Sequence, residues 1–498
     1  MKFASCLSWV PRGIAAAKPV KVKISKDELE SLLLRGREPG DCDETSESEV
    51  DASLAGTEDS GSASSNNPAS GMMRSSSVMG LRGSSAQLDD LNSNDGDDPL
   101  AKYNLEDYDD EDMDTGGGIH EIVAVANPED DGNVTVHESD SSDDEDFLIN
   151  PDDNLLVVGR IVKEEFNLEV YVYNSEDNSF YCHHDYLLDA PPLCLETFSH
   201  DPGAESSSGN LCALGTMNPV IEIWDLDLVE SLEPIGYLGQ SRKRNKHIQV
   251  VDSSDQPRSI RHKDAVLGLS WNHFYGHILA SGSADHRLIL WDIDKAEGSA
   301  KLLEHSDKVQ TLHWHPFESQ ILASGACDSY VKVWDGRDST KSQISVECPG
   351  EEIERVLWNH HSPYYLLLST SGGKVAALDT RNPVLTLHEA HADAVTGKYL
   401  VCLSLSPKVP GCVCTVSADG SLTVWNLTND ASDWTKLADH GFNSGRIHCL
   451  SFCPDSDSVL SVGAEGGDAI KLFDIRSLRN VATTFNLEVD QSNNTTDE

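Results

Sequence analysis

The sequence lacks several features that mark whole classes of protein. It has no run of about 18 apolar residues, so we expect no membrane-spanning helix. The twelve cysteines include no CxxC pair, and no histidine pair stands at zinc-finger spacing. No GxxxxGK[ST] phosphate loop is present, and residues 1–13 do not resemble a signal peptide. We therefore expect an intracellular protein with reduced thiols in its core, no cofactor and no bound metal.

Lysine and arginine are scarce relative to the acidic residues. The chain has 37 of them against 84 Asp and Glu, which gives a formal net charge of −47. A field of this sign repels phosphate backbones and attracts basic surfaces. The charge favours basic proteins as partners, such as ribosomal proteins, assembly factors or histones, with rRNA reached mostly through them. We expect no small-molecule substrate and no membrane partner, and a chain that is monomeric within a larger complex.

One stretch, residues 262–337, contains two copies of the same pattern. His262 precedes Trp291 by 29 positions, and His305 precedes Trp334 by the same 29. Each copy holds alternating apolar strands that are separated by turns rich in Gly and Asp. A repeat of this length that ends in Trp-Asp resembles the blade of a WD-repeat propeller.

The strand pair that precedes each Trp-Asp recurs along the chain. We count seven such units, which end at Tyr173, Trp224, Trp291, Trp334, Leu378, Trp425 and Phe473. Seven blades fit one closed ring without an exposed sheet edge. The predicted fold is therefore all-β: a single seven-bladed WD-repeat β-propeller that follows a long disordered acidic N-terminal region.

The predicted segments follow from changes in composition along the chain. They are an N-terminal segment (1–38), a disordered region rich in Ser, Asp and Glu (39–118), the propeller (119–490) with an acidic loop (127–146) and a basic loop (240–260), and a disordered tail (491–498). A short helix is predicted around 26–35.

Several features of this organisation remain open from the sequence. Either His120–Ala126 or Thr483–Val489 could close the last blade. Residues 398–402 make the distance from His391 to Trp425 five positions too long, which indicates either a real insertion or an error in the gene model. Ser141 and Ser142 precede acidic residues, a context that favours phosphorylation, although a modified loop without consequence fits equally well.

His262, Ser281 and Asp285 could suggest a catalytic triad, but the same residue types recur in several units. In WD-repeat proteins the matching residues form a structural hydrogen-bond network, which satisfies buried polar groups. The predicted networks are His262, Ser281, Asp285 and Trp291; His305, Ser324, Asp328 and Trp334; and His391, Thr415, Asp419 and Trp425. Catalysis would require one special nucleophile, so we predict that the protein is not an enzyme.

Two further patterns could indicate binding sites. His183 and His184 are adjacent on a predicted strand and should point to opposite faces, which argues against a shared metal ion. Arg242, Lys243, Arg244 and Lys246 form a basic cluster in a long loop, where a nuclear-import signal could be read; the alternative is a solvated charge run.

Arg337 and Arg381 each follow the Asp at the end of a unit by two positions. In substrate receptors of cullin-four-type ubiquitin ligases, tandem copies of this pattern contact the ligase adaptor. The first copy matches well, whereas the second lacks the Trp. The two arginines are therefore candidate adaptor-binding residues, although many propellers carry the pattern without that role.

Strings outside the blade pattern narrow the resemblance. They include Ser8–Gly13, Asp146–Ile149, Asn167–Tyr171, His183–Asp185, Pro219–Asp227, Asp307–Leu312, His315–Glu318, Glu352–Val356 and Trp358–Asn359. With these strings the chain resembles the periodic tryptophan protein family over most of 1–490. The departures are the insertion at 398–402 and a basic loop that is shorter than the Lys-rich one common in the family.

The resemblance implies a function. Proteins of this family are nuclear and nucleolar, associate with chromatin, support rRNA synthesis and processing and large-subunit assembly, and have no known catalytic activity. We therefore expect a nucleolar scaffold that acts through protein–protein contacts. The alternatives are a substrate receptor of a cullin-four-type ligase and a chromatin- or histone-binding regulator.

Overall fold

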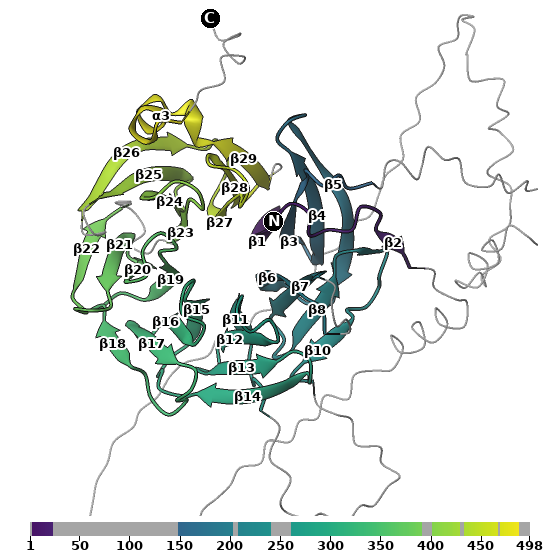
Figure 1. Cartoon of the computed structure of the whole chain (residues 1–498), viewed down its shortest axis with the longest axis horizontal. Helices are drawn as coiled ribbons and strands as arrows, with labels where there is room; N and C mark the ends of the chain where they lie inside the picture. Colours follow the sequence, from purple (N-terminus) through teal and green to yellow (C-terminus); the bar gives the residue numbers. More distant parts are fainter. Residues whose placement is uncertain are drawn as a thin grey trace, which may run out of the picture. The chain divides into compact units, whose positions relative to one another are not determined.

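The computed structural model describes residues 2–22, 148–202, 208–240, 260–390, 401–428, 433–466 and 469–487. All of them belong to one compact unit, which comprises residues 1–24 and 139–498. Within this unit seven antiparallel sheets are arranged as blades around a common centre (Figure 1). The prediction of a single seven-bladed propeller is confirmed.

The first four blades have four strands each. Blade 1 contains β1 (Lys2–Val10), β3 (Asn154–Val162), β4 (Glu165–Asn174) and β5 (Ser179–Leu188). Blade 2 contains β6 (Pro192–His200), β7 (Ser208–Thr216), β8 (Ile221–Asp225) and β10 (Gly236–Leu238). Blade 3 contains β11 (Val266–Trp271), β12 (Ile278–Ser283), β13 (Leu288–Asp292) and β14 (Glu297–Leu302). Blade 4 contains β15 (Val309–Trp314), β16 (Ile321–Ala326), β17 (Tyr330–Asp335) and β18 (Ile344–Glu347).

The remaining blades complete the ring. Blade 5 contains β19 (Ile353–Trp358), β20 (Tyr365–Thr370), β21 (Lys374–Asp379) and β22 (Leu385–Glu389). Blade 6 contains β23 (Val401–Leu405), β24 (Cys412–Ser417), β25 (Ser421–Thr428) and β26 (Asp433–Gly441). The described part of blade 7 contains β27 (Ile447–Phe452), β28 (Val459–Ala464) and β29 (Ile470–Asp474), followed by η4 (Ile475–Ser477) and α3 (Arg479–Phe485).

The N-terminal strand closes the ring, which the sequence did not predict. We expected residues 1–38 to lie outside the propeller, and for Lys2–Val10 this was wrong: β1 pairs with β3 from Lys2 to Val10 and is the strand of blade 1 nearest the centre of the ring (Figure 1). Its buried side chains include Ala4, Trp9 and Val10, and the Trp9 indole donates to the carbonyl of Ser451 in blade 7 (3.3 Å). The strand forms because its apolar residues complete the cores of two blades at once.

Residues after β1 then cross to blade 2. Val20 and Lys21 form β2, which pairs in parallel with β9 (Leu228–Val229). The backbone N–H of Ala16 also donates to the Asp227 carboxylate (3.1 Å). The first 22 residues therefore connect blades 7, 1 and 2.

Of the two predicted closing strands, only Thr483–Val489 falls partly within the described residues. Thr483–Phe485 belong to α3, so the expectation of a strand over 483–489 was wrong for these residues. His120–Ala126 lie outside the described residues. So do the predicted helix (26–35), the regions 39–118 and 491–498, the loop 127–146 and Ser241–Ser259 of the basic loop. Within the described part of the chain, no helix has the length and apolar character needed to cross a bilayer.

The extra residues of blade 6 leave strand pairing undisturbed where they can be seen. Val401 and Cys402 lie in β23, which pairs with β24 without a register shift from Val401↔Ser417 to Leu405↔Val413. Residues 398–400 lie outside the described residues. We predicted that an insertion within this strand would shift its pairing, and β23 from Val401 onward does not show such a shift.

Close packing between the two innermost strands of a blade depends on glycine. In several blades a cysteine of the innermost strand lies against a glycine of the next strand: a Cβ on Gly463 would stand 2.3 Å from Cys449 Sγ, so only glycine fits there. Burial raises the pKa of the Cys6 thiol to about 12, which keeps it protonated. The eleven cysteines within the described ranges are free.

Candidate protein-binding surface

Blade 3 brings His262, Ser281, Asp285 and Trp291 together. The Trp291 indole donates to Ser281 Oγ (2.7 Å), His262 Nε2 lies 2.6 Å from the same oxygen, and His262 Nδ1 lies 3.2 Å from Asp285. Because the carboxylate can only accept, Nδ1 must donate to it, and Nε2 accepts from the serine hydroxyl. Every polar atom of the network is thereby satisfied within the blade.

Blade 4 repeats this arrangement. The Trp334 indole donates to Ser324 Oγ (2.8 Å), which also lies 2.8 Å from His305 Nε2, while His305 Nδ1 contacts Asp328 (2.9 Å). Ser324 and Trp334 are fully buried. Two identical buried networks in separate blades stabilise those blades, and neither presents its serine to a substrate.

Electrostatics support the structural role. Burial acts to raise the pKa of Asp328, but hydrogen bonds from His305 and from the backbone N–H of Ser306 outweigh it and lower that pKa below its usual value. The carboxylate is therefore ionised at neutral pH. It fixes the orientation of His305 and the turn between the second and third strands.

The third predicted network is described only in part. The Trp425 indole donates to Thr415 Oγ1 (3.0 Å), whereas Asp419 accepts from the backbone N–H of Ser421 (2.8 Å). His391 lies outside the described residues.

The metal argument for His183 and His184 needs a correction. We predicted that their side chains point to opposite faces, but a β-bulge in β5 places the two Nδ1 atoms 2.7 Å apart. Burial, reinforced by the neighbouring His183, lowers the pKa of His184 to about 3, and its Nε2 lies 2.9 Å from the Tyr186 hydroxyl. Within the described ranges, no three His, Cys, Asp or Glu side chains are grouped so that they could hold a metal ion.

Two sets of loops share one face of the ring. In each antiparallel blade the first and third strands run in the same direction, so the loops that follow them emerge on the same side. Backbone hydrogen bonds join these loops: Gly336 N–H donates to Gln320 O (2.7 Å), and Thr380 N–H donates to Tyr364 O (2.9 Å). Two loops of each blade therefore build this side of the ring together.

Exposed aromatic side chains gather on these loops in blades 3 to 5. Phe274, Tyr275, Phe317 and Tyr364 are each between 41% and 53% exposed, and only one other large aromatic side chain in the described ranges, Tyr181, is comparably exposed. We call the surface formed by these four residues the aromatic face. Exposed aromatics near one another are typical of protein–protein contacts.

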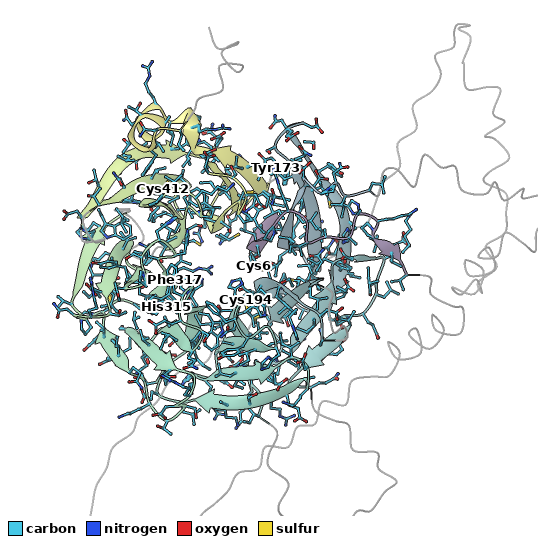
Figure 2. All side chains as sticks on the ribbon, viewed as in Figure 1. Cys6, Tyr173, Cys194, His315, Phe317 and Cys412 are labelled. Carbon is cyan, nitrogen blue, oxygen red and sulfur yellow. The ribbon has the colours of Figure 1, made fainter. Side chains whose placement is uncertain are left out.

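Hydrogen bonds hold the loops of the aromatic face in place. Asn272 Nδ2 donates to Ser319 O in the next blade (2.8 Å), His315 Nε2 donates to Pro363 O (2.8 Å), and His360 Nε2 donates to Ser406 O (2.8 Å). These contacts link blades 3, 4, 5 and 6 in turn, and His315 and Phe317 lie toward the centre of the ring (Figure 2). A surface fixed in this way loses little conformational entropy when a partner binds.

The two candidate adaptor-binding arginines border the aromatic face. Arg337 is exposed and contacts Asp335 through Nε (2.9 Å to Oδ1). Arg381 contacts Asp379 (2.7 Å), and its guanidinium lies 4.4 Å from the centre of the Tyr364 ring. Each arginine is thus positioned by its own blade, and Arg381 stacks on the face itself.

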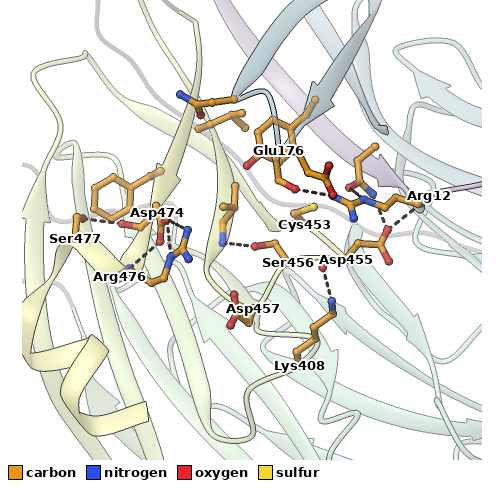
Figure 3. Close-up of a pocket in the computed structure, with 17 residues that line it drawn as sticks. Arg12, Glu176, Lys408, Cys453, Asp455, Ser456, Asp457, Asp474, Arg476 and Ser477 are labelled. Carbon is orange, nitrogen blue, oxygen red and sulfur yellow. Dashed lines mark hydrogen bonds and ion pairs between the residues drawn. The ribbon is translucent and has the colours of Figure 1, made fainter. Parts of the chain in front are cut away.

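A cavity of about 870 Å³ lies on the same side, where blade 7 meets blade 1 (Figure 3). Asp455 accepts from the backbone N–H of Arg12 (2.9 Å) and from Asn154 Nδ2 (2.7 Å), while Arg12 donates to Ser175 Oγ (2.7 Å). Charges of both signs line the cavity, and two of them, Arg476 and Asp474, form an ion pair (2.7 Å). These contacts connect the N-terminal strand to the last blade, so we assign this cavity to closure of the ring.

Sequence reasoning missed the aromatic face, although a signal exists. In blades 3 to 5 the first strand ends in Trp and is followed within a few residues by a histidine and then an aromatic residue, as in Trp314-His315-Pro316-Phe317. The predicted import residues (Arg242, Lys243, Arg244, Lys246) and phosphorylation sites (Ser141, Ser142) lie outside the described residues.

The amino-acid sequence is similar to those of known proteins. The family model "WD domain, G-beta repeat" matches residues 255–292 and 299–335. The periodic tryptophan protein 1 homolog of Drosophila melanogaster is 33% identical over 500 residues, which cover 97% of this chain and 96% of that protein. An uncharacterised WD repeat-containing protein of Schizosaccharomyces pombe is 35% identical over 94% of this chain and 88% of its own. Periodic tryptophan protein 1 of Saccharomyces cerevisiae is 28% identical over 98% and 90%, respectively.

Proposed function

The chain belongs to the periodic tryptophan protein 1 family, and from this premise we propose that it is a non-catalytic scaffold in ribosome biogenesis. In this proposal the protein acts in the nucleolus and supports rRNA synthesis, rRNA processing and large-subunit assembly by holding basic partner proteins. Chain-long similarity to the family supports the assignment, and the propeller supplies a rigid frame for protein–protein contacts.

The aromatic face indicates which residues contact a partner protein. Its aromatic side chains are exposed, and their loops are fixed by hydrogen bonds between blades. Aromatic anchors on a rigid surface can form the centre of an interface. We therefore place the principal partner contact on blades 3 to 5.

Replacement in depleted cells tests this proposal. A Phe274→Ser, Phe317→Ser double variant should fold normally, fail to restore pre-rRNA maturation and lose its association with pre-ribosomal proteins. Leu303→Ser is the matched control, because Leu303 is at least as exposed as Phe274 and Phe317 but follows the fourth strand of blade 3, on the opposite side of the ring. Full restoration of pre-rRNA maturation by the double variant would contradict the assignment.

A role as substrate receptor of a cullin-four-type ligase is the second candidate, because Arg337 and Arg381 lie in adjacent blades beside the aromatic face. An Arg337→Ala, Arg381→Ala double variant distinguishes the two functions. Loss of the adaptor with intact rRNA maturation would show a separate ligase role, whereas no adaptor in purified wild-type complexes would remove this candidate. A normal rRNA profile after depletion would favour a chromatin- or histone-binding function instead.

Localisation tests the remaining part of the proposal. A tagged chain should accumulate in nucleoli, and removal of residues 241–247 should leave it in the cytoplasm. The removed segment contains Arg242, Lys243, Arg244 and Lys246. An unchanged nucleolar signal after the deletion would assign import to another part of the chain.

A further inference from the structure

Blade 2 surrounds its tryptophan differently from blades 3 and 4. Trp224 of β8 matches Trp291 of β13. In blade 3, Ser281 pairs with Ile289, which stands two positions before Trp291. In blade 2, the residue that pairs with Glu222, two positions before Trp224, is Leu214, so a leucine replaces the serine. Without a serine, the Trp224 indole donates to Glu222 Oε2 instead (3.0 Å). A carboxylate thereby occupies a place that in blade 3 is apolar Ile289.

Blade 4 shows how the same position can be neutralised. Lys332 stands two residues before Trp334, as Glu222 stands before Trp224, and both side chains belong to residues that are 8% exposed. Lys332 Nζ lies 3.5 Å from Glu304 and 3.3 Å from Ser345 Oγ, so its charge is compensated within the protein. Among the described residues, Glu222 has no cationic partner within ion-pair distance.

Glu222 opens into a pocket of about 460 Å³ between the outer parts of blades 1 and 2. Three carboxylates line it, from Asp189, Glu222 and Glu233, and its described lining contains no Lys, Arg or His. The lining also includes apolar side chains, among them Trp224 and the exposed Leu187 and Leu232. We call this cavity the blade 1–2 pocket.

Burial of an uncompensated carboxylate has an electrostatic cost. Burial raises the pKa of Glu222, the nearby Asp189 raises it further, and the Trp224 hydrogen bond opposes both. A cation that entered the pocket would remove this cost, and the side chains of Leu187 and Leu232 would cover its aliphatic stem. The three carboxylates lack the grouping that a metal ion requires among the described residues.

We propose that the blade 1–2 pocket receives a lysine or arginine side chain from an extended basic segment of a partner protein. The Glu222 carboxylate forms an ion pair with the incoming group, Asp189 and Glu233 add attraction at the entrance, and Leu187 and Leu232 contact the stem and the flanking apolar residues. This inference rests on the proposed function as a scaffold for basic proteins and gives that function a second, chemically defined site.

Binding of a synthetic peptide to the full-length protein tests the proposal. The probe is a fluorescein-labelled peptide of lysine, leucine and glycine, followed by anisotropy, and its counterpart carries glutamine in place of each lysine. Glu222→Gln keeps an acceptor for the Trp224 indole and removes only the charge. It should weaken binding of the lysine peptide by at least about tenfold, as loss of one member of a buried charge pair does.

Three comparisons make the result specific. The glutamine peptide should bind as weakly to the wild-type protein as the lysine peptide binds to Glu222→Gln. Leu187→Ser, on an exposed wall that the fold does not need, should weaken binding several-fold. Glu389→Gln removes an exposed carboxylate in blade 5 and should leave the affinity unchanged, which excludes a general effect of net charge.

Equal affinity of the wild-type protein and Glu222→Gln for the lysine peptide would overturn the proposal. So would binding that appears only after Arg242, Lys243, Arg244 and Lys246 are all replaced by glutamine, because the pocket would then serve this chain's own basic residues. The peptide assay does not depend on rRNA maturation. Failure of the pocket and failure of the ribosomal role therefore give different results.

Discussion

Blades 4 and 2 each have a tryptophan at the same point of the third strand, but the polar groups around the two tryptophans differ. In blade 4 the Trp334 indole belongs to a buried network whose members satisfy one another, and the nearby Lys332 is paired with Glu304. In blade 2 the Trp224 indole depends on Glu222, a carboxylate that faces a pocket without a cation in its described lining.

The difference separates residues that stabilise the propeller, which we call the frame, from residues that bind a partner. A network that is closed within its blade can only stabilise that blade, since no polar group remains for another molecule. A buried carboxylate that is only partly compensated weakens the isolated protein and strengthens its complex with a cation. Histidine, serine, aspartate and tryptophan in blades 3 and 4 therefore belong to the frame, whereas Glu222 belongs to a binding surface.

The largest expected effect comes from opening the blade 4 network. Ser324→Ala removes the oxygen that serves both Trp334 Nε1 and His305 Nε2 and leaves these buried groups without a partner. We expect a loss of about 3 kcal/mol in the free energy of unfolding, measured with urea. Ser306→Ala, at an exposed serine of the same blade, is the control and should change it by less than about 0.5 kcal/mol.

Blade 2 has a second carboxylate, Glu196, which contacts blade 3. Glu196 accepts from the backbone N–H of Trp271 (3.1 Å), a role that Ser270 and His313 take for the next two blades. Burial raises the pKa of Glu196 to about 7 from an ordinary 4.5, against hydrogen bonding to Trp271 and the charge of Arg355. The folded state then binds more protons than the unfolded state between these values, so the Glu196 contribution becomes less favourable as pH rises through that range.

Glu196→Gln should therefore stabilise the protein by about 2 kcal/mol at pH 8, and the gain should fall toward zero near pH 4.5. Urea unfolding at several pH values measures both ends of this window. A gain that is independent of pH would show that Glu196 does not titrate in the folded protein. The comparison between blade 2 and its neighbours would then be limited to Glu222.

The smallest expected effect on stability comes from the aromatic face. Phe274→Ser and Phe317→Ser remove exposed side chains, so each should change the free energy of unfolding by less than about 0.5 kcal/mol. Thermal unfolding of the purified variants measures this. A loss comparable to that of Ser324→Ala would assign these residues to the frame and would weaken the reading of the face as a contact surface.

Much of the frame could be predicted from the sequence. The fixed distance from His262 to Trp291 and from His305 to Trp334 reveals two blades, and strand alternation reveals those that lack Trp, such as the unit ending at Leu378. The role of Lys2–Val10 could not be predicted, because its partner β3 begins only at Asn154 and no local pattern connects them. Pairing over such a distance is decided by tertiary packing.

The binding surfaces were harder to predict for a different reason. A single alternation pattern fits Glu222 and Lys332 equally, and only the structure shows that one is paired and the other faces a cavity. The bulge that turns His183 toward His184 likewise breaks the alternation on which our metal argument relied. Exposure and bulges depend on neighbouring strands, which a local pattern does not contain.

Matched acid-to-amide changes in the two blades test the central distinction most directly. Asp328 accepts from His305 Nδ1 (2.9 Å) and from the backbone N–H of Ser306 (2.9 Å) and Tyr330 (3.0 Å), whereas Glu222 accepts from Trp224. Urea unfolding at pH 7 should give a loss of about 2 kcal/mol for Asp328→Asn and no loss for Glu222→Gln. Equal losses in the two variants would mean that both carboxylates serve the frame, and the distinction between a closed blade 4 and an open blade 2 would be wrong.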